Sequence, residues 1–240
     1  MGSILFLFFS TLIASIIQST SGFGFSIIIM ALWPMMFSMV DSVWLSLFGS
    51  GIIIGHITLR NYKHVNLKIV GIPLLCSLIA NLVGLSILVN VDNSIARRWL
   101  GGFLIFLSIY MFFAADKIKV SNQWVFGGIA GSLSGLMGGF LNIPGPPIVI
   151  YMAVATQEKK EYLASLQFFF LINFLLKVIY FLARTEVHSV DIQFGLSVFI
   201  ASIAGVLIGT RLFERLSSIH VKNFIYGVML LSGASYLFGK

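Results

Sequence analysis

Residues 134–152 read SGLMGGFLNIPGPPIVIYM, an uncharged and largely apolar stretch that is nevertheless rich in helix breakers. It holds three of the chain's five prolines, Pro144, Pro146 and Pro147, shortly after a run of glycines. In water such a stretch would form a loop. In hydrocarbon each unpaired backbone group costs several kcal/mol, so broken chain survives only where it is buried in protein or lines a polar cavity. The stretch therefore predicts a helix interrupted at membrane depth.

The composition indicates that the chain does lie in hydrocarbon. Of its 240 residues, 58% are hydrophobic and 10% are charged, whereas soluble domains carry roughly 25% charged residues. Uncharged runs, many near the ~20 residues of a spanning helix, cover nearly the whole sequence. We therefore predict an all-α polytopic membrane protein.

The same composition argues against several classes of partner. The net charge of +7 comes from basic residues in short connectors between apolar runs, which is typical of membrane topology and does not indicate a nucleic-acid partner. Cys76 is the only cysteine, so neither an internal disulfide nor a thiol metal site is expected. No cofactor motif is found. A homo-oligomer is neither indicated nor excluded.

The two halves of the sequence resemble each other. Matching positions pair Ser21-Gly22 with Ser134-Gly135, Asn66 with Asp191, Ser77 with Ser202, Gly84 with Gly209 and Gly102 with Gly227. Self-similarity of this kind indicates repeats. We predict one membrane repeat over residues 1–116 and another over 117–240, each with a broken, re-entrant helix pair followed by three spanning helices.

The distribution of basic residues predicts the orientation of the repeats. If they are inverted, one face holds Arg60, Lys63, Lys68, Lys117, Lys119, Lys159, Lys160, Arg211, Arg215 and Lys222, and the other holds Arg97, Arg98, Arg184 and Lys240. Parallel repeats would divide the same residues evenly. Because basic residues concentrate in cytoplasmic loops, inverted repeats are favoured, with both termini outside the cell.

The broken stretch has a counterpart in the first half. Residues 18–34 read QSTSGFGFSIIIMALWP, interrupted by glycines and closed by Pro34. Paired Gly/Pro-broken segments at matching places are the best sequence pointer to a transporter's binding site, and a helix that begins at mid-membrane offers free N–H groups to an anion. The alternative is structural: the glycines permit close helix packing and the prolines produce kinks.

Acidic side chains are missing from the predicted spans. All eight carboxylates fall in connectors or at segment ends, namely Asp41, Asp92, Asp116, Glu158, Glu161, Glu186, Asp191 and Glu214. Cation transporters and proton pumps usually carry acidic groups at mid-depth, so a cation substrate is disfavoured. The histidines are scattered as well, which disfavours a metal site and an enzyme.

Lys177 is the one basic residue within a span, with Asn173 one turn earlier on the same face. A charged group near the bilayer centre costs roughly 2.5–3.5 kcal/mol and by default marks a functional site. Lys177 is therefore either an anion ligand or a residue whose side chain reaches the interface. Two other features have structural alternatives: Ser77, Asn81 and Gly84 form a stripe suited to helix packing, and His56 is more typical of an interface than of a proton carrier.

The chain resembles the TauE/SafE sulfite exporters, the toluene-sulfonate uptake permease family, over essentially its whole length. The resemblance is carried by the two broken segments, the NIPGPP turn and the two-half plan. The resemblance implies secondary transport of small sulfur-containing or organic anions, such as sulfite, sulfonates or thiosulfate, across a bacterial inner membrane. It places the family's glycine motifs on Gly22 and Gly24 and on Gly135, Gly138 and Gly139, with Pro144 beyond. Phe25 and Ser26 stand where many members have glycine, which implies a narrower first-half site.

We therefore predict an anion transporter that works by alternating access about a midplane site. The predicted ligands are backbone amides and side chains of Ser21, Gly22, Gly24, Phe25, Ser26, Gly138, Gly139, Asn142, Pro144, Gly145, Asn173 and Lys177. An anion channel lined by the same segments is the main alternative, and a membrane-embedded enzyme or assembly factor is a third class. The expected partners are a small anion and the lipid bilayer.

Overall fold

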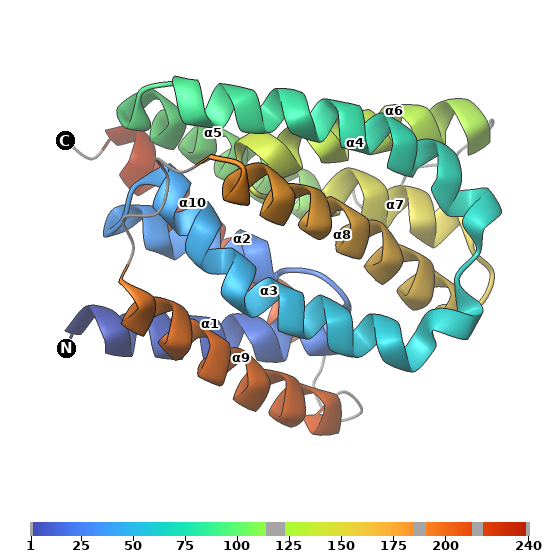
Figure 1. Cartoon of the computed structure of the whole chain (residues 1–240), viewed down its shortest axis with the longest axis horizontal. Coiled ribbons are helices and arrows are strands. Elements are labelled where there is room, and N and C mark those ends of the chain that lie inside the picture. Colours follow the sequence, from blue (N-terminus) through green and yellow to red (C-terminus); the bar gives the residue numbers. More distant parts are fainter. Residues whose placement is uncertain (1, 114–122, 185–190, 213–217, 239–240) are drawn as a thin grey trace. The chain divides into compact units, whose positions relative to one another are not determined.

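The computed structural model describes residues 2–113, 123–184, 191–212 and 218–238. Every element in these ranges is helical (Figure 1), which confirms the predicted all-α class. The predicted repeat boundary at 116/117 lies outside the described residues, as do four basic residues used in the topology count, Lys117, Lys119, Arg215 and Lys240.

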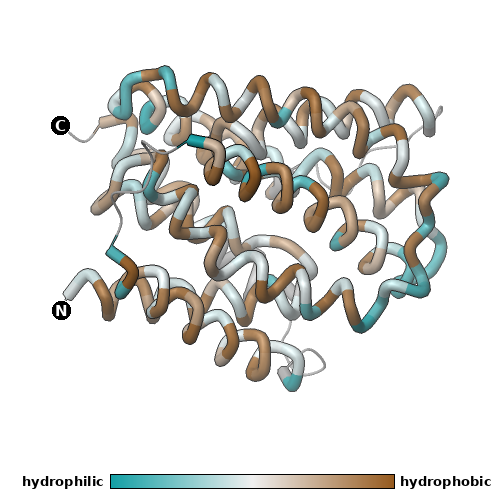
Figure 2. The backbone as a smooth tube through the Cα atoms, viewed as in Figure 1, coloured by the Kyte–Doolittle hydropathy of each residue, from teal (hydrophilic) through white to brown (hydrophobic). Residues whose placement is uncertain are grey.

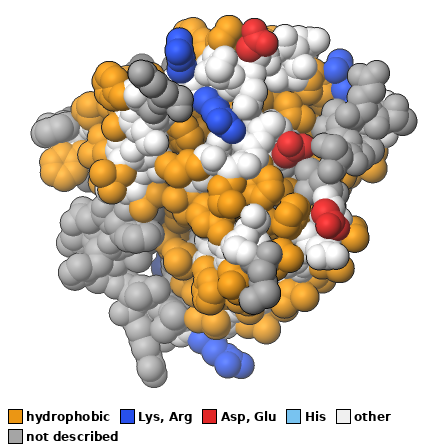
Figure 3. All heavy atoms as spheres, turned by 90° about the vertical axis from the view of Figure 1, so that its left-hand side faces the viewer, with side chains coloured by type: hydrophobic (Ala, Val, Ile, Leu, Met, Phe, Trp, Pro, Cys, Tyr) orange, Lys and Arg blue, Asp and Glu red, His pale blue; other side chains and the backbone are white. Residues whose placement is uncertain are grey.

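Five helices of the described ranges are long and apolar enough to cross a membrane. They are α1 (Gly2–Ser21), α3 (Met39–Asn61, extended by the 3₁₀ turn η2, Tyr62–His64), α4 (Leu67–Asn90), α8 (Lys159–Leu182) and α9 (Ile192–Leu212). Hydrophobic colouring runs along the helices, and hydrophilic colouring gathers at helix ends and connectors, with further hydrophilic segments along α8 (Figure 2). The face drawn in Figure 3 carries mostly hydrophobic side chains and only scattered charged ones. The chain is a multi-pass membrane protein.

The order of elements recurs along the chain. In the first half the helix pair α1 and α2 (Phe25–Leu32, followed by the 3₁₀ turn η1, Trp33–Met35) precedes α3, α4 and α5 (Asn93–Phe113). In the second half α6 (Gln123–Phe140) and α7 (Gly145–Ala155) precede α8, α9 and α10 (Ser218–Phe238). A broken pair followed by three longer helices is the order that the sequence repeat predicts. The inverted orientation of the two repeats stays a prediction.

The chain divides into two compact units that do not coincide with the sequential halves. Unit 1 comprises Met1–Ser50, Asn90–Lys117 and Val187–Lys240, and unit 2 comprises Gly51–Val89 and Ile118–Glu186. Each unit thus contains one broken helix pair, α1 and α2 in unit 1 and α6 and α7 in unit 2, together with helices from both halves of the sequence.

Small residues bring the helices of unit 1 together. Gly205 of α9 faces Ser15 of α1, and Gly209 faces the backbone of Ile16 one turn further on, so α1 and α9 pack along their lengths (Figure 1). Gly101 of α5 and Gly233 of α10 each face the other's carbonyl. Close approach through glycine is the usual packing mode between membrane helices, where van der Waals contact replaces the hydrophobic effect.

In unit 2 a row of glycines on α6 lies against the backbone of α4. Side chains at Gly131, Gly135 and Gly139 would collide with the carbonyls of Pro73, Ser77 and Asn81 respectively. The four-residue spacing on both helices keeps these residues in register. The Ser77–Asn81–Gly84 stripe is therefore a packing surface, since Gly84 in turn faces the backbone of Leu136.

Candidate functional site

The break between α6 and α7 lies in unit 2 and occupies residues 141–144. Asn142 takes a left-handed conformation, with φ 58°, which asparagine tolerates better than most residues. The amides of Leu141 and Ile143 both donate to the carbonyl of Met137, at 2.9 and 3.2 Å. The chain then turns back so that Pro144 packs on Gly138, where a Cβ would lie 3.0 Å from the proline ring. The glycine is thus explained by this close approach.

The start of α7 offers fewer amide donors than a helix N-terminus usually does. Pro146 and Pro147 have no N–H, and the N–H of Ile148 donates to Ser134 Oγ at 3.0 Å. Gly145, the first residue of the helix, keeps its N–H. The broken segment therefore supplies the partial positive charge of a helix N-terminus but few free amides, because two positions are prolines and the Ile148 N–H is bonded to Ser134.

Lys177 of α8 reaches this break. Its ammonium donates to Asn142 Oδ1 at 2.6 Å, and only 5% of the residue's surface is exposed. The side chain is thus turned into the protein, which argues against the interface interpretation, and its role as an anion ligand stays a prediction. No carboxylate among the described residues pairs with Lys177, and Asn142 takes one of its three N–H donors.

A polar bridge one turn away positions α8 against α4. Asn173 Oδ1 accepts from both Ser77 Oγ and Asn81 Nδ2, each at 2.8 Å. Asn173 Nδ2 donates to the carbonyl of Phe169 at 3.0 Å. These bonds occupy the Oδ1 of Asn173 and one of its two N–H donors, so Asn173 holds α8, and with it Lys177, in register with α4. Asn81 Oδ1 is buried without a hydrogen-bond partner among the described residues.

The break between α1 and α2 lies in unit 1 and spans residues 22–24. Gly22 and Gly24 have φ of 83° and 114°, a region that only glycine adopts at no cost. The N–H of Phe25, the first residue of α2, donates to Gln18 Oε1 at 3.0 Å, and the N–H of Gly22 donates to the carbonyl of Gln18 at 2.8 Å. Gln18 therefore occupies two amides that the sequence offered as anion ligands.

The structure places the predicted residues in two groups. In unit 2, Asn142, Pro144, Gly145, Gly138, Gly139, Asn173 and Lys177 gather around the α6–α7 break. In unit 1, Gly22, Gly24, Phe25 and Ser26 lie at the α1–α2 break, Phe25 is fully buried and Ser26 is half-buried. Ser21 ends α1, and its side chain lies outside the described part of the chain.

Sequence reasoning missed three residues that shape the breaks. Gln18 and Ser134 each cap the helix that follows their break, and Tyr151 donates its hydroxyl to a carbonyl of α4. Ser134 lies in the stretch that predicted the break, and the sequence repeat pairs it with Ser21. The capping bond itself depends on how the chain turns back, which local spacing does not specify.

The groups that line the unit 2 site are complementary to a small anion. A buried ammonium without a counter-charge is costly, and the N-terminus of α7 favours negative charge as well. The neighbouring groups are neutral amides and hydroxyls. Within the described residues no cluster of three or more His, Cys, Asp and Glu side chains is arranged to hold a metal ion.

Comparison with known families gives one match over nearly the entire chain. The family described as Sulfite exporter TauE/SafE matches residues 7–236. Neither the curated proteins nor the solved structures give a match.

Proposed function

The chain belongs to the sulfite exporter TauE/SafE family, and from this premise we propose that it is a secondary transporter of small sulfur-containing or organic anions in the bacterial inner membrane. Sulfite, sulfonates and thiosulfate are the substrate class. Transport proceeds by alternating access, with both termini outside the cell. The predicted ligands of the first break are Ser21, Gly22, Gly24, Phe25 and Ser26, and they stay predictions on sequence grounds, although Gln18 accepts the N–H groups of Gly22 and Phe25 in this structure.

The observation that carries the proposal is the buried Lys177 ammonium hydrogen-bonded to Asn142. Its remaining N–H donors and its charge are complementary to an anionic oxygen, and charge-assisted hydrogen bonds of this kind are roughly twice as strong as neutral ones. An anion bound there gives the lysine the counter-charge that the described residues do not supply. Asn142 and Asn173 fix the position of Lys177, and the α7 N-terminus adds a weaker attraction.

The first test is ligand binding by the purified protein. A ligand that binds only the folded state raises the melting temperature by mass action, so sulfite, thiosulfate and methanesulfonate should each be tested by thermal shift in detergent. We expect Lys177→Met to remain folded and to lose the shift, whereas Lys177→Arg retains part of it. A shift in Lys177→Met equal to that of the unmodified protein would remove Lys177 from the binding site.

The second test separates a carrier from a channel lined by the same segments. In liposomes a carrier gives slow, saturable uptake that is accelerated by unlabelled anion on the opposite side. A channel gives sustained electrical conductance without such counterflow. The proposal predicts counterflow of sulfite, and large conductance would replace the alternating-access mechanism with the channel.

A further inference from the structure

The C-terminal part of α8 carries polar side chains beyond Lys177 that the proposed site does not use. Tyr180 and Arg184 follow Lys177 at intervals of three and four residues. At 3.6 residues per turn Lys177 and Tyr180 lie about 60° apart on one face of α8, and Arg184 follows two residues after the helix ends at Leu182. We call Lys177, Tyr180 and Arg184 the α8 row. It extends from the buried ammonium to Arg184 beyond the end of the helix, a rise of about 10 Å.

The hydroxyl of Tyr180 is unusual for a tyrosine near a helix end. Its oxygen is buried and has no hydrogen-bond partner among the residues that the structure describes. A tyrosine of the interfacial belt places its hydroxyl among head groups and water, where a partner is always available. A buried donor left unsatisfied is costly, so the Tyr180 hydroxyl can donate to an acceptor from outside the described residues.

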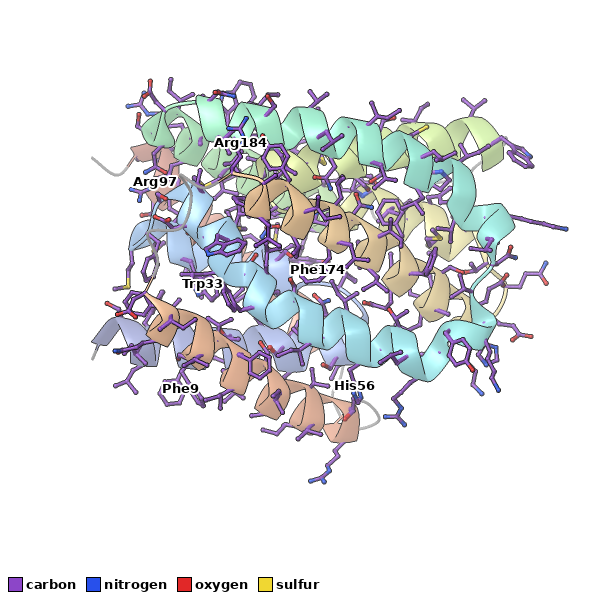
Figure 4. The ribbon with its side chains drawn as sticks, in the orientation of Figure 1. Phe9, Trp33, His56, Arg97, Phe174 and Arg184 are labelled. Carbon is purple, nitrogen blue, oxygen red and sulfur yellow. The ribbon has the colours of Figure 1, made fainter. Side chains whose placement is uncertain are left out.

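Arg184 is placed to attract that acceptor. Its guanidinium carbon lies 5.2 Å from the centroid of the Tyr180 ring, and the residue is exposed where α8 ends (Figure 4). The ring contact orients the guanidinium above Tyr180 without using its hydrogen-bond donors. The row therefore presents a charged, exposed donor, then a buried hydroxyl, then the buried ammonium. That order suits a negatively charged solute with several acceptor oxygens.

We infer that Tyr180 and Arg184 form an outer anion subsite through which a small oxyanion passes between the membrane surface at the C-terminal end of α8 and Lys177. The inference rests on the proposed function, because it takes Lys177 as the inner site. Arg184 raises the local concentration of the anion at the entrance. Tyr180 then donates one hydrogen bond to the anion as it moves along the helix.

The test is sulfite flux into liposomes that contain the full chain. Tyr180→Phe removes only the hydroxyl and keeps the ring under Arg184, and we expect flux about tenfold slower, the usual cost of one hydrogen bond to a charged group. Arg184→Gln should slow flux at low ionic strength and make it insensitive to salt, because screening weakens steering by exposed charges. Arg184→Lys should restore both the rate and the salt dependence. Tyr162→Phe and Arg60→Gln are the matched controls and should leave flux unchanged.

Thermal shift with sulfite accompanies each flux measurement. Retention of the shift in Tyr180→Phe and Arg184→Gln, together with slow flux, supports an outer subsite distinct from the Lys177 site. Flux equal to that of the unmodified protein in both variants, with flux lost in Lys177→Met, would overturn the outer subsite and leave the proposed function standing. Flux retained in Lys177→Met would overturn the site assignment itself, and the outer subsite with it.

Discussion

The hydroxyl of Tyr151 in α7 donates a 3.1 Å hydrogen bond to the carbonyl of Ile69 in α4. Pro73 lies four residues beyond Ile69 inside the same helix, and it has no N–H to serve that carbonyl. The Tyr151 hydroxyl of α7 thus supplies the hydrogen bond that the Ile69 carbonyl of α4 does not receive from Pro73. In hydrocarbon the freed carbonyl needs such a donor from the protein, because water is not available to it.

Tyr151→Phe should therefore destabilise the protein by about 1–3 kcal/mol, the cost of leaving a buried acceptor unsatisfied. The ring, which packs beside Gly127, is retained in this variant, so the change isolates the hydroxyl. The measurement is the free energy of unfolding, or the melting temperature, in a single detergent.

Pro73→Ala supplies the matched control. Alanine restores an N–H that donates to Ile69, so the cost of Tyr151→Phe should largely vanish when both changes are combined. A double-mutant cycle measures this coupling directly. If Tyr151→Phe lowers the free energy of unfolding equally with alanine and with proline at position 73, the hydroxyl does not stabilise the protein through the Ile69 carbonyl.

The packing of α6 on α4 predicts a sharp contrast between two glycines that lie two turns apart on α6. A Cβ at Gly135 would collide with the backbone of Ser77, whereas one at Gly128 would meet Cys76 Sγ at an ordinary 3.8 Å. Gly135→Ala should thus force α4 and α6 apart and cost about 1–3 kcal/mol. Gly128→Ala should be neutral or stabilising by up to about 1 kcal/mol, because alanine is the better helix former.

Melting temperatures of the two variants in detergent compare them directly. Both lie on the same helix and gain the same methyl group, so differences in helix propensity cancel. Equal stability of the two variants would show that α6 does not pack on α4 through its glycines.

Local patterns in the sequence predict the helices and the two breaks well. Glycine in the left-handed region ends α1 at Ser21, and a glycine-proline run separates α6 from α7. These events depend on residues within one or two turns, so spacing alone reveals them. Hydrophobic runs likewise predict the spans, because hydrocarbon requires apolar side chains of sufficient length.

Contacts between distant residues are not contained in such patterns. The sequence marked Lys177 as unusual, but its bond to Asn142 depends on how α8 packs in unit 2. It also suggested that the amides of both breaks would be available, whereas Gln18 and Ser134 occupy some of them. A side chain that caps a helix several residues away becomes visible only when the fold brings it there.

Gln18 offers a direct measure of one such cap. Gln18→Met keeps the size of the side chain but removes the acceptor of the Phe25 N–H, so we expect a loss of about 0.5–2 kcal/mol in stability, as for other N-terminal caps. The melting temperature in detergent reports it. Ser134→Ala, which removes the acceptor of the Ile148 N–H in the other break, should cost a similar amount. An unchanged melting temperature in both variants would mean that neither cap contributes to holding its break.

Lys177 has no counter-charge among the described residues, and a substitution at Asn142 can supply one. Asn142→Asp places a carboxylate where the amide oxygen accepts from the ammonium at 2.6 Å, and aspartate tolerates the left-handed backbone at this position. The new carboxylate should pair with Lys177 and take the place of the transported anion. We therefore expect the melting temperature without ligand to be unchanged or raised, and the shift produced by sulfite or methanesulfonate to be lost.

Asn142→Gly separates this effect from a change in the break itself. Glycine keeps the left-handed backbone and removes the acceptor without adding charge, so the anion should still bind, with affinity changed by no more than about tenfold, the worth of one hydrogen bond. Loss of binding in Asn142→Asp with retention in Asn142→Gly assigns the effect to charge. Undiminished binding in Asn142→Asp would mean that the anion does not use the Lys177 ammonium, since a paired lysine in a buried site has little attraction left for a second negative charge.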